Sequence, residues 1–414
     1  MDKEIGRPMS GRRYLVVGAG ISGSTIARLM AGREPDSSIT VIDSSDRIAG
    51  ACSDRIQDGI DVQDLGPHIL HTDDAEVWGF LSRFTDFNAY LHRVKGIIGG
   101  SEVPLPFNTD SLRICFPPTA AGEIEKKLVN AYGVGARVPV DELKKSDDRD
   151  IRTLAAFLER RCTPDGGGQV PAGLCGAADR GIVIVSREPG CYGEKYQGVP
   201  VGAFNNTRRG TVLGGYSAMV RNMLDMPNVK VCLGTPFDPD SADDYDRIFY
   251  TGSADGLLDY RFGRLPYRSR RFVFETHLRE HVLDNAVIEY PENYDFERIH
   301  EFKYYLGTKT QTTMTAKEYP DEYVPGKNEP CFTIPSAESV ALHRKYAEAA
   351  ASEFPNLKLL GRLGDYRDYS IGEAVSRSIS VFREEFGPEL PEIRNHKSSR
   401  TAGSKTPTVM YLGY

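Results

Sequence analysis

The stretch that decides the fold is Gly18-Ala19-Gly20-Ile21-Ser22-Gly23, a G-x-G-x-x-G turn. It follows the short apolar run 14–17 and opens a segment of helical composition over 22–31. A second β-branched run, 39–42, ends at Asp43, about 20 residues after the last glycine of the turn. This order of strand, glycine turn, helix and strand predicts a βαβ unit that binds a dinucleotide.

Each residue type in this turn has a physical reason. Gly18 permits the sharp turn, Gly20 lets the backbone approach a pyrophosphate, and Gly23 lets the helix pack closely on the strand. The helix that begins near Ser22 offers unpaired N–H groups and the positive end of its dipole to phosphates. Asp43 can accept hydrogen bonds from ribose hydroxyls. The alternative is a glycine-rich turn without a ligand.

Two further segments favour FAD over NAD. Arg47-Ile48-Ala49-Gly50-Ala51 resembles the second signature of the flavoproteins with two dinucleotide-binding halves, although its glycine pair is incomplete. Far downstream, the run 357–360 predicts a strand that ends at Gly361-Arg362 before another helix over 371–382. Flavoproteins of that type use such a returning strand and helix to hold the flavin end.

The rest of the chain divides into two regions of different residue composition. Residues 108–185 contain two helical segments, 120–131 and 152–161, and predict a helical insertion. Residues 263–340 are aromatic and β-branched and predict an antiparallel sheet, followed by a long helix over 336–354. The expected strands of this sheet include 271–274, 286–288, 302–305 and 312–315.

Composition excludes several classes of protein. The 414 residues include 51 Lys and Arg against 58 Asp and Glu, a formal charge of −7, which argues against nucleic acid as a partner. No apolar run approaches the ~20 residues of a membrane span, and the polar segment 1–13 is not a signal peptide. None of the seven cysteines forms a C-x-x-C pair, which argues against a zinc site, and we expect reduced thiols in the cytoplasm.

The string Leu65-Gly66-Pro67-His68-Ile69-Leu70-His71-Thr72 resembles the G-x-H-I-F-H-T signature of the UDP-galactopyranose mutases. Further motifs of that family follow in the same order, which is more specific than one glycine turn. They are Arg93-Val94-Lys95, Pro104 to Asn108, Tyr250-Thr251-Gly252, Leu265 to Ser269, Arg298 to Glu301, Lys317 to Pro320 and Gly361 to Gly364.

The resemblance implies an isomerase that binds FAD without a covalent link. Such a mutase interconverts the pyranose and furanose forms of UDP-galactose or a related nucleotide-sugar with no net redox change. The reduced flavin attacks the anomeric carbon through N5, and the flavin–sugar adduct lets the ring open and reclose. The implied partner is therefore a small nucleotide-sugar, and neither a nucleic acid nor a membrane is expected.

The same resemblance and the glycine turn together assign the site residues. The expected catalytic residues, besides flavin N5, are His68, His71 and Arg298. The expected cofactor-binding residues are Gly18, Gly20, Ser22, Gly23, Asp43, Ser44, Gly50, Ala51, Gly66, Pro67, His68, Gly252, Gly361, Arg362, Ser370 and Ile371. The expected substrate-binding residues are His92, Arg208, Arg209, Arg268, Arg298, Phe332 and Asp368, and no metal is expected.

The substrate half of the pattern departs from the family. His92 stands where the family has an asparagine, and Cys331-Phe332 replaces a tyrosine pair. Asp368 occupies the position of a phosphate-binding tyrosine, which is unfavourable unless Arg367 or another cation pairs with it. The only tryptophan, Trp78, lies upstream of the helical segment that carries the family's uridine-binding tryptophan. The mobile-loop arginine does not follow Pro200-Val201, so Arg208 or Arg209 is expected to substitute for it.

We therefore expect an α/β fold in which an FAD-binding Rossmann-like domain carries a helical insertion and an antiparallel β-sheet domain. The expected limits are 11–92, 210–262 and 341–390 for the FAD-binding domain, 108–209 for the helical domain, 93–107 and 263–340 for the sheet domain, and 391–414 for a tail. Two alternatives stay open: an FAD oxidoreductase of the amine-oxidase type, and a flavin-binding scaffold that has lost catalysis. The sequence does not set the oligomeric state, for which a homodimer is one expectation.

Overall fold

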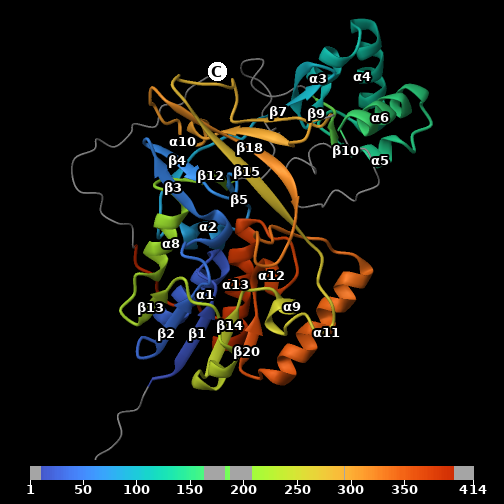
Figure 1. Cartoon of the computed structure of the whole chain (residues 1–414). Coiled ribbons are helices and arrows are strands. Elements are labelled where there is room, and N and C mark those ends of the chain that lie inside the picture. Colours follow the sequence, from blue (N-terminus) through green and yellow to red (C-terminus); the bar gives the residue numbers. More distant parts are fainter. Residues whose placement is uncertain (1–10, 163–181, 187–207, 293, 396–414) are drawn as a thin grey trace, which may run out of the picture.

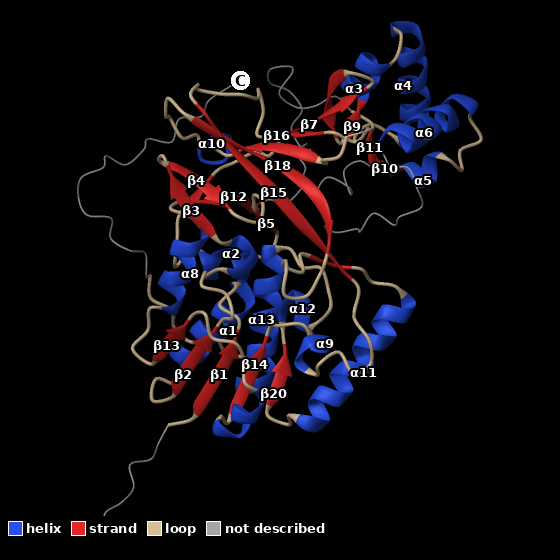
Figure 2. Ribbon diagram, viewed as in Figure 1, coloured by secondary structure: helices blue, strands red, loops and turns tan. Residues whose placement is uncertain are grey.

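The computed structural model describes residues 11–162, 182–186, 208–292 and 294–395. They form an α/β lobe, a large sheet above it, and a helical region at the far end of that sheet (Figure 1). Figure 2 shows that helices flank the strands of the α/β lobe, whereas the large sheet is built almost wholly of strands.

A parallel five-stranded sheet forms the centre of the α/β lobe. Its order is β13 (Val229–Cys232), β2 (Ser38–Ile42), β1 (Arg13–Val17), β14 (Arg247–Tyr250) and β20 (Leu357–Leu359). The sheet thus joins segments from the two ends and the middle of the chain. Since all five strands run the same way, the loops at their carboxyl ends meet along one edge, where ligands bind in folds of this kind.

Apolar side chains on both faces of β1 explain why helices cover both sides of this sheet. Tyr14 and Val16 pack into one core and Leu15 into the other. The first core lies beside α1 (Ile21–Arg33), α8 (Tyr216–Leu224) and α13 (Ile371–Phe386). The second lies beside α9 (Ala254–Leu257) and α11 (Ala337–Glu353). Each fully buried leucine or isoleucine contributes about 1.5–3 kcal/mol to this packing.

The large sheet has seven strands, and all of its pairings are antiparallel except the one between β16 and β7. Their order is β19 (Phe332–Thr333), β15 (Tyr267–His277), β18 (Thr313–Glu322), β17 (Arg298–Glu301), β16 (Val287–Glu289), β7 (Val94–Ile98) and β8 (Ser101–Leu105). One face carries Phe272, Phe274 and Ala316 and packs on β4 (Ile60–Gln63). We call it the inner face.

Two small sheets connect the lobes. Strand β12 (Arg208–Val212) pairs with β5 (Leu70–Thr72) and with β6 (Phe87–Asn88). Strand β3 (Asp54–Gln57) pairs with β4. Helix α2 (Ala75–Leu81) follows β5 and begins at Asp74, whose carboxylate accepts from two backbone N–H groups. This region places the segment 60–72 between the α/β lobe and the large sheet.

The helical region has its own apolar core, which continues into β7 and β8 through Val94 and Leu105. Its helices are α3 (Thr109–Cys115), α4 (Pro118–Tyr132), α5 (Val140–Leu143) and α6 (Arg149–Cys162). Its strands are β9 (Phe107–Asn108), β10 (Arg137–Pro139) and β11 (Ile182–Ile184). The other short elements in the described ranges are η1 (Gly50–Cys52), η2 (Pro239–Asp244), α10 (Lys303–Leu306) and α12 (Gly361–Gly364).

This is the α/β arrangement expected from the sequence, with one local error. The predicted strand over 302–305 is wrong, because Lys303–Leu306 form helix α10. The buried Lys303 Nζ donates to the carbonyl oxygens of Glu280 and Thr310, each at 2.7 Å, and Tyr305 enters the core. These tertiary contacts override the β-propensity of the aromatic residues.

The first residues of the expected tail lie against the α/β lobe. Ile393 packs on its core, and the Ile393 carbonyl accepts a hydrogen bond from Arg83 Nη1 at 3.1 Å. Residues 396–414 lie outside the described residues. None of the helices in the described ranges is long and apolar enough to cross a membrane.

Candidate functional site

A cavity of about 670 Å³ lies at the carboxyl ends of β1, β2, β14 and β20. Most of the predicted cofactor residues line it: Gly18, Gly20, Ser22, Gly23, Asp43, Ser44, Gly50, Ala51, His68, Gly252, Gly361, Arg362, Ser370 and Ile371. Gly66 and Pro67 are not in its lining, and neither are His71, His92, Arg208, Arg209, Arg268, Arg298, Phe332 and Asp368. The structure therefore separates the predicted cofactor residues from the predicted substrate residues.

The glycine turn leaves room for a ligand at one position only. Gly18 has a φ of 108°, and a Cβ there would lie 1.9 Å from the Thr251 hydroxyl. A Cβ on Gly23 would lie 1.9 Å from the Gly18 carbonyl oxygen. At Gly20, by contrast, the nearest atom would be the Gly50 Cα at 3.8 Å. Gly18 and Gly23 are thus required by the protein itself, whereas Gly20 borders the cavity.

The start of helix α1 has the character of an anion site. Gly20 is its N-cap, no side chain caps it, and its first turn holds no acidic residue. The first N–H groups of the helix therefore keep their capacity to donate, and they lie beside the cavity. The chain thus has the donor set that a pyrophosphate needs at this place.

Asp43 stabilises the loops around this anion site. Its Oδ2 accepts from the Ala19 N–H at 2.8 Å and its Oδ1 from the Ser45 N–H at 2.9 Å. Ala49, where the incomplete glycine pair begins, has a φ of 74°, and its N–H donates to the Ala19 carbonyl at 2.9 Å. A left-handed alanine costs roughly 1–2 kcal/mol, so this bridge holds a strained loop against the glycine turn.

The returning segment closes the cavity from the other side. Gly361 has a φ of 84°, and helix α13 begins at Ser370 with a reciprocal capping box to Glu373. Arg362 donates from Nη1 to the Cys331 carbonyl and from Nη2 to the Tyr369 carbonyl, both at 2.9 Å. Its guanidinium thus joins β19 to the segment before α13.

His68 lies where the cavity meets the large sheet. Its Nδ1 is 2.8 Å from the Gly66 carbonyl oxygen, and its N–H donates to Gln63 Oε1 at 2.7 Å. Because a carbonyl only accepts, Nδ1 carries the proton and Nε2 is left as an acceptor. Burial, with the charge of Arg362, lowers the pKa of His68 to about 4. Gly66 lies against Phe272 of the inner face, because a Cβ on Gly66 would be only 2.9 Å from the Phe272 ring.

His71, the other histidine predicted to be catalytic, and the two candidate loop arginines lie on paired strands. His71 of β5 is opposite Arg209 of β12, and Thr72 is opposite Arg208. Arg208 Nη1 donates to the Asp73 carbonyl at 3.0 Å. The structure thus brings three predicted site residues together on a small sheet, away from the lining of the cavity. Pro200 and Val201 lie outside the described residues.

Arg298 belongs to a buried cluster of charges on the inner face. Its Nε is 3.5 Å from Glu318 Oε2, and its Nη2 is 3.7 Å from Glu289 Oε1. His300 Nε2 is 2.8 Å from the same Glu318 oxygen. Burial alone would raise the pKa of Glu318, but Arg298, His300 and Arg270 hold it well below its usual range. Glu318 is therefore an ionised carboxylate inside the protein.

His92 lies beside this cluster. Its ring stacks on Tyr305, with centroids 6.0 Å apart, and its Nδ1 is 3.2 Å from the Tyr90 hydroxyl. The Tyr305 hydroxyl is in turn 3.2 Å from His300 Nδ1. Burial, and then the charges of His300 and Arg298, lower the pKa of His92 to about 3. His92 is thus a neutral hydrogen-bonding group at neutral pH.

The cluster reaches the predicted flavin end of the cavity. The charge of Glu318 acts on His68, where it opposes the lowering of the pKa. Phe272, which contacts Gly66, is directly opposite Glu318 in the sheet. The His68 end of the cavity and the Arg298 cluster are therefore neighbours.

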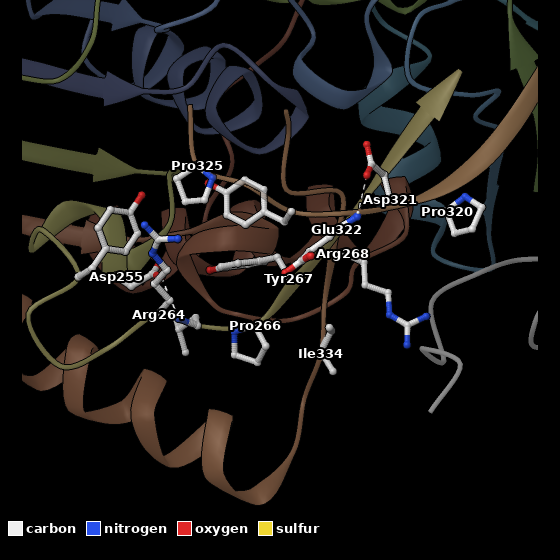
Figure 3. Close-up of a pocket in the computed structure, with 13 residues that line it drawn as sticks. Asp255, Arg264, Pro266, Tyr267, Arg268, Pro320, Asp321, Glu322, Pro325 and Ile334 are labelled. Carbon is white, nitrogen blue, oxygen red and sulfur yellow. Dashed lines mark hydrogen bonds between the residues drawn. The ribbon is translucent and has the colours of Figure 1, made fainter. Parts of the chain in front are cut away.

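Arg268 lines a second cavity of about 660 Å³, shown in Figure 3. This cavity lies between α9, the start of β15 and the end of β18. In Figure 3 the Arg268 side chain extends away from Asp255 and Arg264. Tyr260 lines both cavities, so they are adjacent, but Arg268 lies at the one that the predicted cofactor residues do not line.

Asp368 is paired with a cation, as its position requires, and this cation is Arg362 and not Arg367. Arg362 Nε lies 3.3 Å from Asp368 Oδ1, whereas Arg367 lies over the Tyr369 ring at 5.4 Å. Phe332 lies between two guanidinium groups, 5.3 Å from Arg270 and 5.8 Å from Arg362. The altered substrate positions are thus packed against arginines.

Arg270 is the residue of this region that the sequence reasoning missed. It is buried, forms an ion pair with Glu297, and lies 3.1 Å from Glu318 through Nη1. The period of two along β15 is the signal that could have found it, because Arg270, Phe272 and Phe274 alternate with the exposed residues Arg271 and Val273. Within the described ranges, no three His, Cys, Asp or Glu side chains are grouped to hold a metal ion.

Trp78 lies far from the helical region. It is half-buried in α2 and its ring packs on Phe87 of β6, with centroids 4.4 Å apart. The position of this tryptophan is explained by packing in the α/β lobe, where it contacts the core of that lobe.

Comparisons with known proteins agree with this geometry. A family model described as UDP-galactopyranose mutase matches residues 182–368, and one described as an NAD(P)-binding Rossmann-like domain matches residues 16–84. A probable UDP-galactopyranose mutase of Klebsiella pneumoniae is 28% identical over 381 residues, 89% of this chain and 94% of that protein. A dTDP-fucopyranose mutase of Escherichia coli is 26% identical and covers 88% of this chain and 96% of that protein.

Solved structures share the fold. A reduced UDP-galactopyranose mutase has a TM-score of 0.62 at 13% identity and covers 91% of this chain and 94% of that one. A putative protoporphyrinogen oxidase of Exiguobacterium has a TM-score of 0.59 at 13% identity and covers 92% of this chain and 99% of that one. The match to the NAD(P)-binding Rossmann-like model agrees with the βαβ unit at the start of the α/β lobe.

Proposed function

Because this chain belongs to the UDP-galactopyranose mutase family, we propose that it is an isomerase that interconverts the pyranose and furanose forms of a nucleotide-sugar. The observation that carries this proposal is that the His68 end of the cofactor cavity lies near the Arg298 cluster, since Gly66 packs on Phe272, which pairs with Glu318. A sugar held there would have its diphosphate near guanidinium groups and its anomeric carbon near the flavin.

FAD is the cofactor that the residues of the cavity favour. The uncapped start of α1 and the open space at Gly20 suit a pyrophosphate, and Asp43 lies where a ribose is expected. The returning segment from Gly361 to Ile371 lines the same cavity, as expected for the flavin end. When bound and reduced, the flavin would supply the nucleophile for the anomeric carbon.

The residues of this chain would bind and orient the sugar. Arg298 suits the oxygens of a diphosphate leaving group because a guanidinium donates in a fork. His68 and His92 are neutral, so they can accept or donate hydrogen bonds without adding charge. His71, Arg208 and Arg209 on their small sheet are proposed to border the substrate from the side of β12. Arg268, Phe332 and Asp368 stay proposed substrate contacts.

Two nucleotide-sugars are the first candidates as substrates. Relatives of similar identity are named for UDP-galactopyranose and for dTDP-fucopyranose, which differ in the base, at the 2′ position of the nucleoside sugar and at carbon 6 of the hexose. The altered positions Phe332 and Asp368 lie beside Arg362 and do not by themselves select between the two. We therefore propose the class of substrate and leave the choice to the assay.

The test is an anaerobic turnover assay. The purified protein is reduced with dithionite, each pyranose substrate is added separately, and furanose product is sought by chromatography, with the oxidised protein as control. The cofactor is identified by releasing it from the denatured protein. Product from the reduced sample alone supports the mutase, whereas consumption of oxygen with an oxidised product would favour the oxidoreductase alternative. Bound FAD with neither activity would favour the scaffold.

We further propose that the protein works in the cytoplasm. Among the described residues, Cys52, Cys115, Cys232 and Cys331 are free thiols, which suits a reducing compartment. Cell fractionation tests this. A homodimer also remains a proposal, and light scattering of the purified protein would measure the mass.

A further inference from the structure

Arg270 lies in the inner face with its guanidinium almost fully enclosed. Its side chain is only 4% exposed, and Nη1 contacts both Glu297 Oε2 and Glu318 Oε1. A guanidinium buried to this degree needs partners, and two carboxylates supply them. Phe332 packs on the group at 5.3 Å. Within the described residues, no ion pair or ring contact joins Arg270 to a predicted cofactor residue that lines the cavity.

The two oxygens of Glu318 are divided between the hydrogen-bond donors and guanidinium groups around it. Oε1 faces Arg270 at 3.1 Å, while Oε2 faces His300 at 2.8 Å and Arg298 at 3.5 Å. Among these three contacts the one from Arg298 is the longest, although the charge of Arg298 also lowers the pKa of Glu318. If Arg270 were absent, Oε1 would lose its partner, and the carboxylate would be drawn to Arg298 instead.

The charges in the cluster make this competition strong. The cluster holds the carboxyl groups of Glu289, Glu297 and Glu318 and the guanidinium groups of Arg270 and Arg298. Burial lowers the pKa of His300, although its hydrogen bond to Glu318 opposes this, so His300 adds no charge at neutral pH. Without Arg270, Arg298 would face Glu318 and Glu289 in a site with little water, and Glu318 would have no second guanidinium to share its charge.

We propose that Arg270 is a positioning residue that keeps Arg298 available to the diphosphate of the substrate. It does so by holding Glu318 Oε1 and neutralising Glu297, so that Arg298 is not consumed by the carboxylates around it. The inference rests on the proposed function, because it concerns how tightly Arg298 can bind a nucleoside diphosphate. It predicts a defect in substrate binding, with the chemistry of the bound substrate largely kept.

The main experiment compares two neighbouring arginines. Arg270→Met removes the buried charge at similar volume, and Arg271→Met is its control, since Arg271 is exposed on the other face of the same strand and lies over the Tyr319 ring at 4.0 Å. We expect Arg270→Met to raise KM for the nucleotide-sugar, and Kd for UDP on the oxidised holoprotein, by about tenfold or more, with kcat within about threefold. Arg271→Met should stay within about twofold of wild type in all three.

Two more variants separate positioning from a merely structural role. Arg270→Lys keeps a charge beside both carboxylates, so it should recover most of the affinity for UDP. In Arg270→Met/Glu318→Gln the competing carboxylate is also neutral, so Kd for UDP should return toward wild type. Flavin content and the unfolding temperature are measured for each variant. If Arg270→Met does not retain flavin, the Arg270→Lys and double variants decide.

The outcomes distinguish this inference from the proposed function. If the wild-type protein binds neither UDP nor dTDP and converts neither sugar, the proposed function fails. If the wild type is active and Arg270→Met has the KM and Kd of Arg271→Met, the positioning role is overturned. An equal loss of affinity in the double variant and in Arg270→Met would also overturn it, because the effect would then not pass through Glu318.

Discussion

Arg362 and Asp368 form an ion pair, with Nε of the arginine 3.3 Å from Oδ1 of the carboxylate. The same guanidinium donates to the Cys331 and Tyr369 carbonyl oxygens. Burial raises the pKa of Asp368 and Arg362 opposes this. Asp368, at the position where the sequence resemblance implies a phosphate-binding tyrosine, is thus compensated by Arg362, which lines the cofactor cavity. The pair connects the predicted cofactor residues to the predicted substrate residues.

Asp368→Asn tests this connection. Removing the carboxylate leaves the charge of Arg362 uncompensated beside the cavity, and a positive charge favours the reduced, anionic form of a flavin. We expect the reduction potential of the bound flavin to rise, on the order of 30 mV, equivalent to ~1.4 kcal/mol for a two-electron couple. Spectral titration against a dye of known potential measures this. An unchanged potential would show that Asp368 does not act on the cofactor.

Gly20→Val should separate cofactor binding from folding. The nearest atom to a Cβ at Gly20 is 3.8 Å away, so the side chain fits the protein but projects toward the cavity. We expect a folded protein with an unfolding temperature close to that of the apoprotein and at least a tenfold weaker affinity for FAD. The flavin absorbance of the purified protein and reconstitution with added FAD provide the two measurements.

Gly23→Ala is the matched comparison for this variant. Its Cβ would lie 1.9 Å from the Gly18 carbonyl oxygen, so helix α1 must move away from β1. Overpacking of this kind costs about 1–3 kcal/mol or more, which should appear as a lower unfolding temperature even without cofactor. If Gly20→Val lost as much stability as Gly23→Ala, the open space at Gly20 would not be a ligand site.

The sequence predicted best what depends on local pattern. The glycine turn, β1, β2 and the long helices α11 and α13 were all expected, because periodicity and turn chemistry are local signals. The helix α10 was missed because its two buried lysine hydrogen bonds come from segments about 7 and 23 residues away. Arg270 was missed because its partners Glu297 and Glu318 meet it only once β15, β17 and β18 are assembled.

His68 illustrates the same limit at the site. Its motif indicated a place beside the flavin, but not its charge or its tautomer, which depend on the Gly66 carbonyl and on burial. We expect His68 to stay neutral above about pH 5, with a titration midpoint near pH 4 and the proton on Nδ1. Nitrogen chemical shifts of labelled histidine, assigned with His68→Gln, measure both. A midpoint near the ordinary value of 6.5 would contradict the enclosure of this ring.

Asp61 should make the protein less stable as the pH rises from its ordinary pKa of 3.8 to about 7. Burial, and then the charge of Asp54, raise the pKa of Asp61 to about 7, and within the described chain its Oδ1 has no hydrogen-bond partner. The unfolded chain releases this proton near the ordinary value of 3.8, so the stabilising effect of the protonated form is complete below that pH and is lost as the pH rises through about 7.

Asp61→Asn keeps the shape without the charge. We expect it to raise the free energy of unfolding by on the order of 2 kcal/mol at pH 8 and by much less at pH 5, measured in urea at both values. An equal gain at both pH values would mean that Asp61 is already ionised in the folded protein at pH 5, and that the effect of the substitution comes from something other than its proton.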